Sequence, residues 1–151
     1  MKLTPIKDIL FVSIQLLLFL LYFLSPFQTS LQINHFIKYT ALLFAVIGLL
    51  VILIAIYQLN RNLTPFPTPK KNGTLVQSGP YKFVRHPVYS GIILAATGYG
   101  LFDGSIWKIC IGLGLIILFY FKSKYEENML CRHFPEYESY KKKTGRFFPF
   151  I

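Results

Sequence analysis

The sequence predicts an all-α, polytopic membrane protein with about four transmembrane helices, the last two forming a hairpin, plus a cytoplasmic connector and a C-terminal helix. Three observations support this fold class. The 151 residues are 54% hydrophobic and only 15% charged, and their mean hydropathy is +0.49. Long apolar runs recur along the chain. The 16 Lys and Arg residues cluster between and after these runs and give a net charge of +10. This composition excludes a disordered chain and an ordinary soluble enzyme.

The first two spans are predicted from residues 9–24 and 40–59, which contain no charged side chain. An apolar helix of about 20 residues crosses the hydrocarbon core, because its length must match about 30 Å. Lys2 and Lys7 precede the first run, but no small-x-small cleavage site follows it. We therefore expect an uncleaved first span rather than a signal peptide.

The predicted hairpin consists of residues 89–102 and 106–121, which flank the polar turn Asp103-Gly104-Ser105. The first arm is short and contains Gly91, Gly98 and Gly100. Small residues of this kind allow helices to approach closely within lipid. The short arm is also compatible with a buried helix that does not span the bilayer.

The distribution of positive charge predicts the orientation. In a four-span topology, every Lys and Arg except Lys38 and Lys108 falls on one side of the membrane. The positive-inside rule then places both termini and the segment after the second span in the cytoplasm, for an integral protein of the inner or plasma membrane. The basic charge is explained by this orientation and by attraction to anionic lipids, so we expect no nucleic-acid partner.

We expect a single domain over residues 1–151, with two N-terminal spans in 1–59 and the functional part in 60–151, because the length leaves no room for a separate soluble domain. Cys110 and Cys131 lack the spacing of a zinc site or a disulfide framework. The sequence therefore predicts no metal site. A Walker loop, a G-x-G-x-x-G element and a Ser-His-Asp order are also missing from the sequence.

The segment after the second span carries the first candidate site. Pro65, Pro67 and Pro69 forbid a regular helix and favour an extended path. A short apolar stretch follows between two turn signals, and Pro87 stands where the first turn of the third span should begin. His86 is thereby predicted at a helix entrance, where backbone N–H groups favour an anion such as a carboxylate.

The end of the last span carries the second candidate site. Glu126 and Glu127 form an acidic pair in a basic protein. Lys122 lies four residues before Glu126, so the two share a helix face. On its own, such a pattern is typical of a solvated helix end.

Considered together, these segments resemble the isoprenylcysteine carboxyl methyltransferase family, which in turn is similar to the phospholipid N-methyltransferases. The resemblance rests on residues 79–81 (GPY), 85–91 (RHPVYSG), 126–127 (EE), 134–140 (FPEYESY) and 148–151 (FPFI). It covers residues 60–151. It implies a membrane enzyme that binds S-adenosylmethionine at the cytoplasmic face and methylates a lipophilic acceptor reached from the bilayer.

The resemblance also implies roles for individual residues. The cofactor-binding positions fall on Gly73, Thr74, Leu75, Val76, Tyr81, His86, Pro87, Val88, Tyr89 and Glu126. The acceptor-binding positions fall on Lys122 and Glu127. At position 122 the isoprenylcysteine enzymes carry an arginine, and lysine lacks the planar fork that suits a carboxylate. The acceptor therefore stays open between the carboxylate of a prenylated cysteine-like compound and the amine of a phospholipid or similar molecule.

The chemistry of these residues suits that cofactor. Tyr81 and Tyr89 offer electron-rich faces to a sulfonium cation. Glu126 can accept hydrogen bonds from ribose hydroxyls or from an ammonium group, and backbone N–H groups of residues 74–76 can hold adenine or a carboxylate. Methyl transfer needs alignment and exclusion of water rather than a covalent nucleophile. An amine acceptor would also have to lose a proton, for which Glu127 or His86 is the nearest candidate.

Two other functions remain open at the level of the sequence. A small four-span transporter fits the length, but transport of protons or cations usually needs an acid within the membrane, and Asp8 and Asp103 stand at the edges of the predicted spans. Membrane sterol reductases are similar in their C-terminal halves and use NADPH, whose 2′-phosphate fits an acidic pair poorly. The sequence does not predict the oligomeric state.

Overall fold

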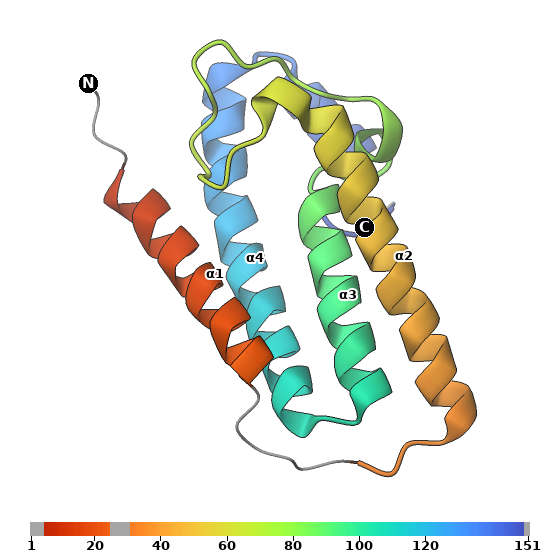
Figure 1. Cartoon of the computed structure of the whole chain (residues 1–151). Helices are drawn as coiled ribbons and strands as arrows, with labels where there is room; N and C mark the ends of the chain where they lie inside the picture. The colour runs from red at the N-terminus through yellow and green to blue at the C-terminus, as the bar shows by residue number, and fades with distance from the viewer. Residues whose placement is uncertain (1–4, 25–30, 150–151) are drawn as a thin grey trace.

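The computed structural model describes residues 5–24 and 31–149 (Figure 1). Within these ranges the chain forms five α-helices and two short 3-10 turns, Asn60–Asn62 and Gly79–Lys82, and no β-strand. The helices are α1 (Ile6–Leu24), α2 (His35–Leu59), α3 (Pro87–Asp103), α4 (Ile106–His133) and α5 (Tyr137–Lys143). The prediction of an all-α fold with a hairpin near its C-terminal end and a final short helix is confirmed.

Three helices are long and apolar enough to cross a membrane: α1, α4, and α2 together with the 3-10 turn that extends it to Asn62. The remaining hairpin arm, α3, has 17 residues and rises about 25 Å. It lies alongside α2 and α4 over much of their length (Figure 1). The protein is therefore an integral membrane protein in which α3 packs between two spans.

The four long helices are arranged in the spatial order α1, α4, α3, α2 (Figure 1). The connector of residues 63–86, α5 and the start of α1 gather at one end of the bundle. The turn between α3 and α4 lies at the opposite end, where α2 and α4 begin with Lys38 and Lys108 in their first turns. The connector and the acidic end of α4 thus meet on the same side, as the sequence predicts.

Small residues allow α2 and α3 to pack at close range. A Cβ atom added at Gly48 would lie 2.6 Å from the backbone nitrogen of Ala95, and one at Gly98 would lie 2.6 Å from the carbonyl oxygen of Ala41. Both distances are shorter than side chains tolerate. This contact fixes the entrance of α3, and with it His86, against the end of α2.

The segment after α5 folds back onto the entrance of α3. The backbone N–H of Arg85 donates to the carbonyl of Gly145 at 2.9 Å, and that of His86 donates to the carbonyl of Arg146 at 3.2 Å. The Ser90 hydroxyl donates to the carbonyl of Phe147 at 2.8 Å. The segment after α5 therefore holds the residues around His86 in place.

Candidate active site

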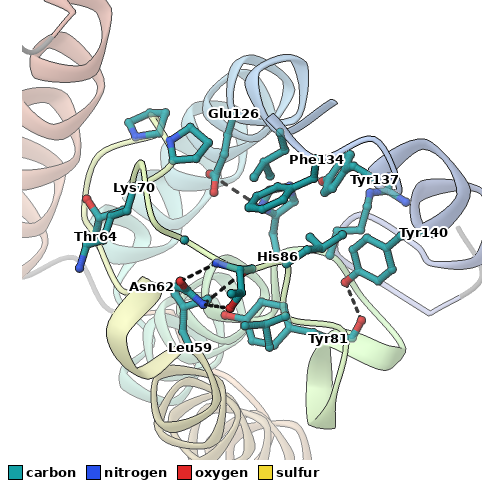
Figure 2. A pocket seen from close by; sticks show the side chains of 18 of the residues that line it. Leu59, Asn62, Thr64, Lys70, Tyr81, His86, Glu126, Phe134, Tyr137 and Tyr140 are labelled. Atoms are coloured by element: carbon teal, nitrogen blue, oxygen red, sulfur yellow. Dashed lines mark hydrogen bonds and ion pairs between the residues drawn. The ribbon is translucent and has the colours of Figure 1, made fainter. Parts of the chain in front are cut away.

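A pocket of about 670 Å³, including its open mouth, lies where the connector faces the end of α4 and α5. Figure 2 shows Asn62 on the connector side, with Glu126, Phe134 and Tyr137 across the pocket. The full lining is Leu59, Asn62, Thr64, Phe66, Pro67, Pro69, Lys70, Gly73, Thr74, Leu75, Val76, Tyr81, Arg85, His86, Glu126, Leu130, Phe134, Tyr137 and Tyr140. The predicted loop Gly73–Val76 and the predicted Tyr81, His86 and Glu126 are thus brought together.

Asn62 clamps the predicted cofactor loop to the end of α2. Its side-chain nitrogen donates to the carbonyl and the hydroxyl of Thr74 at 3.1 and 3.2 Å, and its oxygen accepts from the Thr74 N–H at 3.1 Å (Figure 2). The Thr74 N–H is therefore occupied by the protein itself. Across the described ranges, the N–H groups of Leu75 and Val76 have no hydrogen-bond partner. Sequence reasoning missed Asn62, because nothing local distinguishes it from other polar residues at a helix end.

His86 stands directly before α3, with Pro87 as the first, buried helical residue as predicted. The imidazole stacks on the ring of Tyr89, with centroids 5.3 Å apart and planes 7° apart. Its Nε2 lies 3.2 Å from Oε1 of Glu127, and its Nδ1 lies 3.9 Å from Oε2 of Glu126. His86 is therefore held between the two carboxylates, on the pocket wall.

Glu126 faces the pocket. Its Oε2 accepts a hydrogen bond of 2.8 Å from the Tyr89 hydroxyl, and its side chain is 24% exposed. A second lobe of the pocket extends past this pair and is lined by Leu63, Val88 and Tyr89 among others. The lobe runs between the end of α2 and the beginning of α3. The predicted Val88 and Tyr89 thus belong to the lobe, and Glu126 lines both parts.

Glu127 points away from the pocket, into a cluster of cations. It is 1% exposed, and it accepts from Nε of Arg85 at 2.9 Å and from Nη2 of Arg146 at 2.9 Å. Lys141 is a further cation at 3.8 Å. Neither lobe is lined by Glu127. The structure thus places this predicted acceptor residue behind His86, where it joins α4 to the C-terminal segment. The sequence offered no signal for its arginine partners.

Lys122 is also outside the lining of both lobes. Its ammonium group is buried and donates to Gln15 Oε1 at 2.6 Å and to the carbonyl of Pro65 at 3.0 Å. It also lies 5.3 Å from the centre of the Tyr89 ring. Although Lys122 shares a helix face with Glu126, the two form no ion pair in the described structure.

Three buried tyrosines, Tyr81, Tyr137 and Tyr140, complete the lining. Burial raises the pKa of Tyr81 well above its usual value, and the nearby Glu126 carboxylate raises it further, so the Tyr81 hydroxyl keeps its proton. Burial likewise raises the pKa of Tyr137. The Tyr137 hydroxyl is buried at the pocket and has no hydrogen-bond partner in the part of the chain that the structure describes. An unpaired buried hydroxyl is costly, so it indicates a place where a ligand would bond. Sequence reasoning did not select Tyr137.

Comparison with known proteins adds the following. A family model described as phospholipid methyltransferase matches residues 36–137. The cobalt-zinc-cadmium resistance protein CzcN of Cupriavidus metallidurans is 35% identical over 81 residues, which are 53% of this chain and 38% of that protein. The nickel-cobalt-cadmium resistance protein NccN of Alcaligenes xylosoxydans xylosoxydans is 33% identical, with the same coverage. The chain thus spans less than two fifths of the length of these relatives.

A solved structure of the eukaryotic intramembrane Ras methyltransferase ICMT (isoprenylcysteine carboxyl methyltransferase) matches with a TM-score of 0.70. The match covers 99% of this chain and 55% of that one, at 21% identity. At this identity the likeness concerns the fold. It extends over the whole described bundle, including the connector and α5.

Proposed function

Because the chain belongs to the phospholipid methyltransferase family, we propose that it transfers a methyl group from S-adenosylmethionine to a lipophilic acceptor at the membrane surface. The observation that carries this proposal is the convergence of Tyr81, His86, Glu126 and the 73–76 loop on one pocket. These segments are far apart in the sequence, and the resemblance assigns all of them to the same cofactor.

The residues present fit the cofactor. The unpaired Tyr137 hydroxyl, the partly exposed Glu126 carboxylate and the unpartnered N–H groups of Leu75 and Val76 offer both donors and acceptors to a ligand. A molecule with ribose hydroxyls, an adenine ring and an amino-acid tail needs this mixture. When bound, S-adenosylmethionine supplies a methyl group on a positively charged sulfur. Tyr81 lies in the same wall and offers an aromatic face to a cation.

The protein's own part in the reaction is positioning and exclusion of water. Asn62 fixes the loop, and the Tyr89 hydroxyl orients the carboxylate of Glu126. Phe66, Pro67 and Pro69 of the connector form one wall of the pocket. These contacts keep the lining in one arrangement before a ligand arrives, which lowers the ordering cost of binding.

The second lobe lies where the end of α2 faces the beginning of α3. Leu63, Val88 and Tyr89 line it together with the polar His86 and Glu126. Its position beside two membrane-embedded helices supports an acceptor that enters from the bilayer. A carboxylate acceptor of the prenylated cysteine type needs no proton removal. The family description favours a phospholipid amine as the second candidate. For an amine, we propose that His86 takes the proton, because Glu127 is already bound to Arg85 and Arg146.

The first test is binding of S-adenosylhomocysteine and of NADPH to the purified protein in detergent. We expect S-adenosylhomocysteine to bind and NADPH not to bind. His86→Ala and Glu126→Ala should each abolish binding, whereas the exposed Glu136→Ala should not change it. Retained affinity in both site variants would reject the site. Binding of NADPH alone would favour a reductase, and binding of neither ligand would reject methyl transfer.

The orientation and the acceptor need separate experiments. We propose that the pocket and both termini face the cytoplasm, since Lys38 and Lys108 are the two basic residues at the other end of the bundle. A C-terminal green fluorescent protein should then be fluorescent and a C-terminal alkaline phosphatase inactive, and the reverse pattern would refute this orientation. Mass spectrometry of membrane extracts supplied with isotopically labelled methyl donor would identify the acceptor class.

A further inference from the structure

We propose that Asp8 and Gln15 of α1, together with Lys122 of α4, form a buried polar latch that holds the proline-rich connector as the outer wall of the pocket. In this role Lys122 is a positioning residue and does not contact the acceptor. The ligand part of this inference rests on the proposed function. The structural part, that the latch fixes the connector, stands independently of it.

The first anchor is the ammonium group of Lys122. This side chain is 1% exposed, and its Nζ donates both to Gln15 of α1 and to the carbonyl of Pro65 in the connector. The ring of Tyr89 is a third partner, so the ammonium group contacts Gln15, Pro65 and Tyr89. Burying an ammonium group costs several kcal/mol unless it is well bonded. Lysine side chains are almost never fully buried unless they are paired, so these contacts, rather than packing alone, explain the position of Lys122.

The second anchor is Asp8, which is completely buried in the first turns of α1. Its Oδ2 accepts a hydrogen bond of 3.2 Å from the backbone N–H of Thr68. The Thr68 hydroxyl in turn lies 3.5 Å from the sulfur of Met129 on α4. Asp8 and Gln15 are seven positions apart, about two helical turns, so both project from the same face of α1. That face is directed at the connector and α4.

The residues between the two anchors form the wall of the pocket. Phe66 and Pro67 lie between Pro65 and Thr68, and Pro69 follows; these three all line the pocket. The prolines have no N–H group, so the segment has few backbone donors with which to fix itself by regular hydrogen bonding. Side chains from α1 and α4 replace those bonds. The docking of α1 and the shape of the pocket are therefore thermodynamically linked.

Amide hydrogen exchange, measured by mass spectrometry on connector peptides of the ligand-free protein in detergent, tests the structural part. We expect Lys122→Met and Gln15→Leu to accelerate exchange at least tenfold at Phe66 and Thr68, the residues of this segment whose N–H groups are hydrogen-bonded, and Asp8→Leu to do so at Thr68. Lys124→Met is the matched control, because it removes an exposed positive charge from the same helix. Unchanged exchange in both Lys122→Met and Gln15→Leu would overturn the latch.

Two further variants separate positioning from general damage to the fold. Gln15→Glu keeps an acceptor for Lys122 and should retain the protection of the wild-type connector. The double variant Gln15→Leu/Lys122→Met removes both partners, which relieves the unpaired polar group that each single variant leaves. The double variant should unfold at a higher temperature than either single variant. Its connector amides should still exchange faster than those of the wild-type protein. Slow connector exchange in the double variant, or fast exchange in Gln15→Glu, would contradict the proposal.

Ligand binding then separates the latch from the alternative that Lys122 touches the acceptor. The latch predicts that Lys122→Met weakens S-adenosylhomocysteine binding about tenfold and leaves kcat at saturating methyl donor within about twofold. An acceptor contact predicts unchanged S-adenosylhomocysteine affinity and lost turnover, and this result would overturn the positioning role. If the wild-type protein binds no S-adenosylhomocysteine, the proposed function fails, and connector exchange still decides the latch.

Discussion

The adjacent carboxylates of Glu126 and Glu127 should have separable effects when each is changed to glutamine. Glu127 is 1% exposed and bonded to Arg85, His86 and Arg146. Glu127→Gln would leave the two arginines without this counter-charge and would turn an amide donor toward one of them. Loss of one partner of a buried pair costs about 3–5 kcal/mol. For a chain of this length, that corresponds to a fall of about 6–20 °C in the unfolding midpoint.

Glu126 should behave in the opposite way. It is 24% exposed and accepts one hydrogen bond, from the Tyr89 hydroxyl. Replacing that acceptor costs about 1 kcal/mol or less, because water reaches the group. Glu126→Gln should therefore change the midpoint by only about 2–4 °C. It should nevertheless weaken S-adenosylhomocysteine binding strongly, since the carboxylate faces the pocket.

Size-exclusion chromatography after heating, in detergent, measures both midpoints, with the exposed Glu136→Gln as control. Trypsin provides a second measurement, because Glu127 holds the C-terminal segment through Arg146 and lies near Lys141. Cleavage after Lys141–Lys143 should be faster in Glu127→Gln than in Glu126→Gln. Equal midpoints and equal cleavage in the two variants would refute the assignment. So would a Glu127→Gln protein that is fully stable but has lost acceptor turnover.

Three other variants test the rest of the site and the packing that supports it. Asn62→Ala removes the hydrogen bonds that hold Thr74. The affinity for S-adenosylhomocysteine, measured by calorimetry, should therefore fall about tenfold. An unchanged affinity would show that the position of the loop does not affect binding. Tyr137→Phe removes the unpaired hydroxyl, so thermal unfolding of the ligand-free protein should show equal or higher stability. The same variant should bind S-adenosylhomocysteine more weakly. Undiminished affinity would exclude this hydroxyl as a ligand contact. Gly98→Leu would drive a side chain into the backbone of Ala41, so the purified protein should unfold at markedly lower temperature, and normal stability would contradict the close contact of α2 with α3.

The spans and the helix entrances were predictable because they depend on local properties of the chain. An uncharged apolar run must cross or pack within a bilayer whatever its neighbours are, so residues 9–24 and 40–59 identify α1 and α2. The observed α4 continues to His133, well past the end of its apolar run at residue 121, because polar residues with good helix propensity extend it beyond the lipid. Pro87 marked the beginning of α3 correctly.

Within the site, the sequence could assign residues that belong to a recognisable motif. It could not assign contacts between a residue and a partner on a distant segment. The resemblance assigned His86 and Glu126, and the structure brings both to the pocket. It could not indicate that Glu127 turns toward Arg146, because neighbouring residues on a helix point about 100° apart and only the packing of α4 decides which one faces the pocket.

The amino-acid sequence by itself determined that this is a helical membrane protein with its two candidate-site segments at one end, because hydropathy and charge act on each segment separately. The family likewise follows from residues that can be recognised along the chain. Only the tertiary structure decided which polar groups serve the pocket and which serve the fold. Lys122 shows the reason: its bonds to Gln15 and Pro65 join three segments that are distant in sequence, and such contacts exist only once the helices have packed.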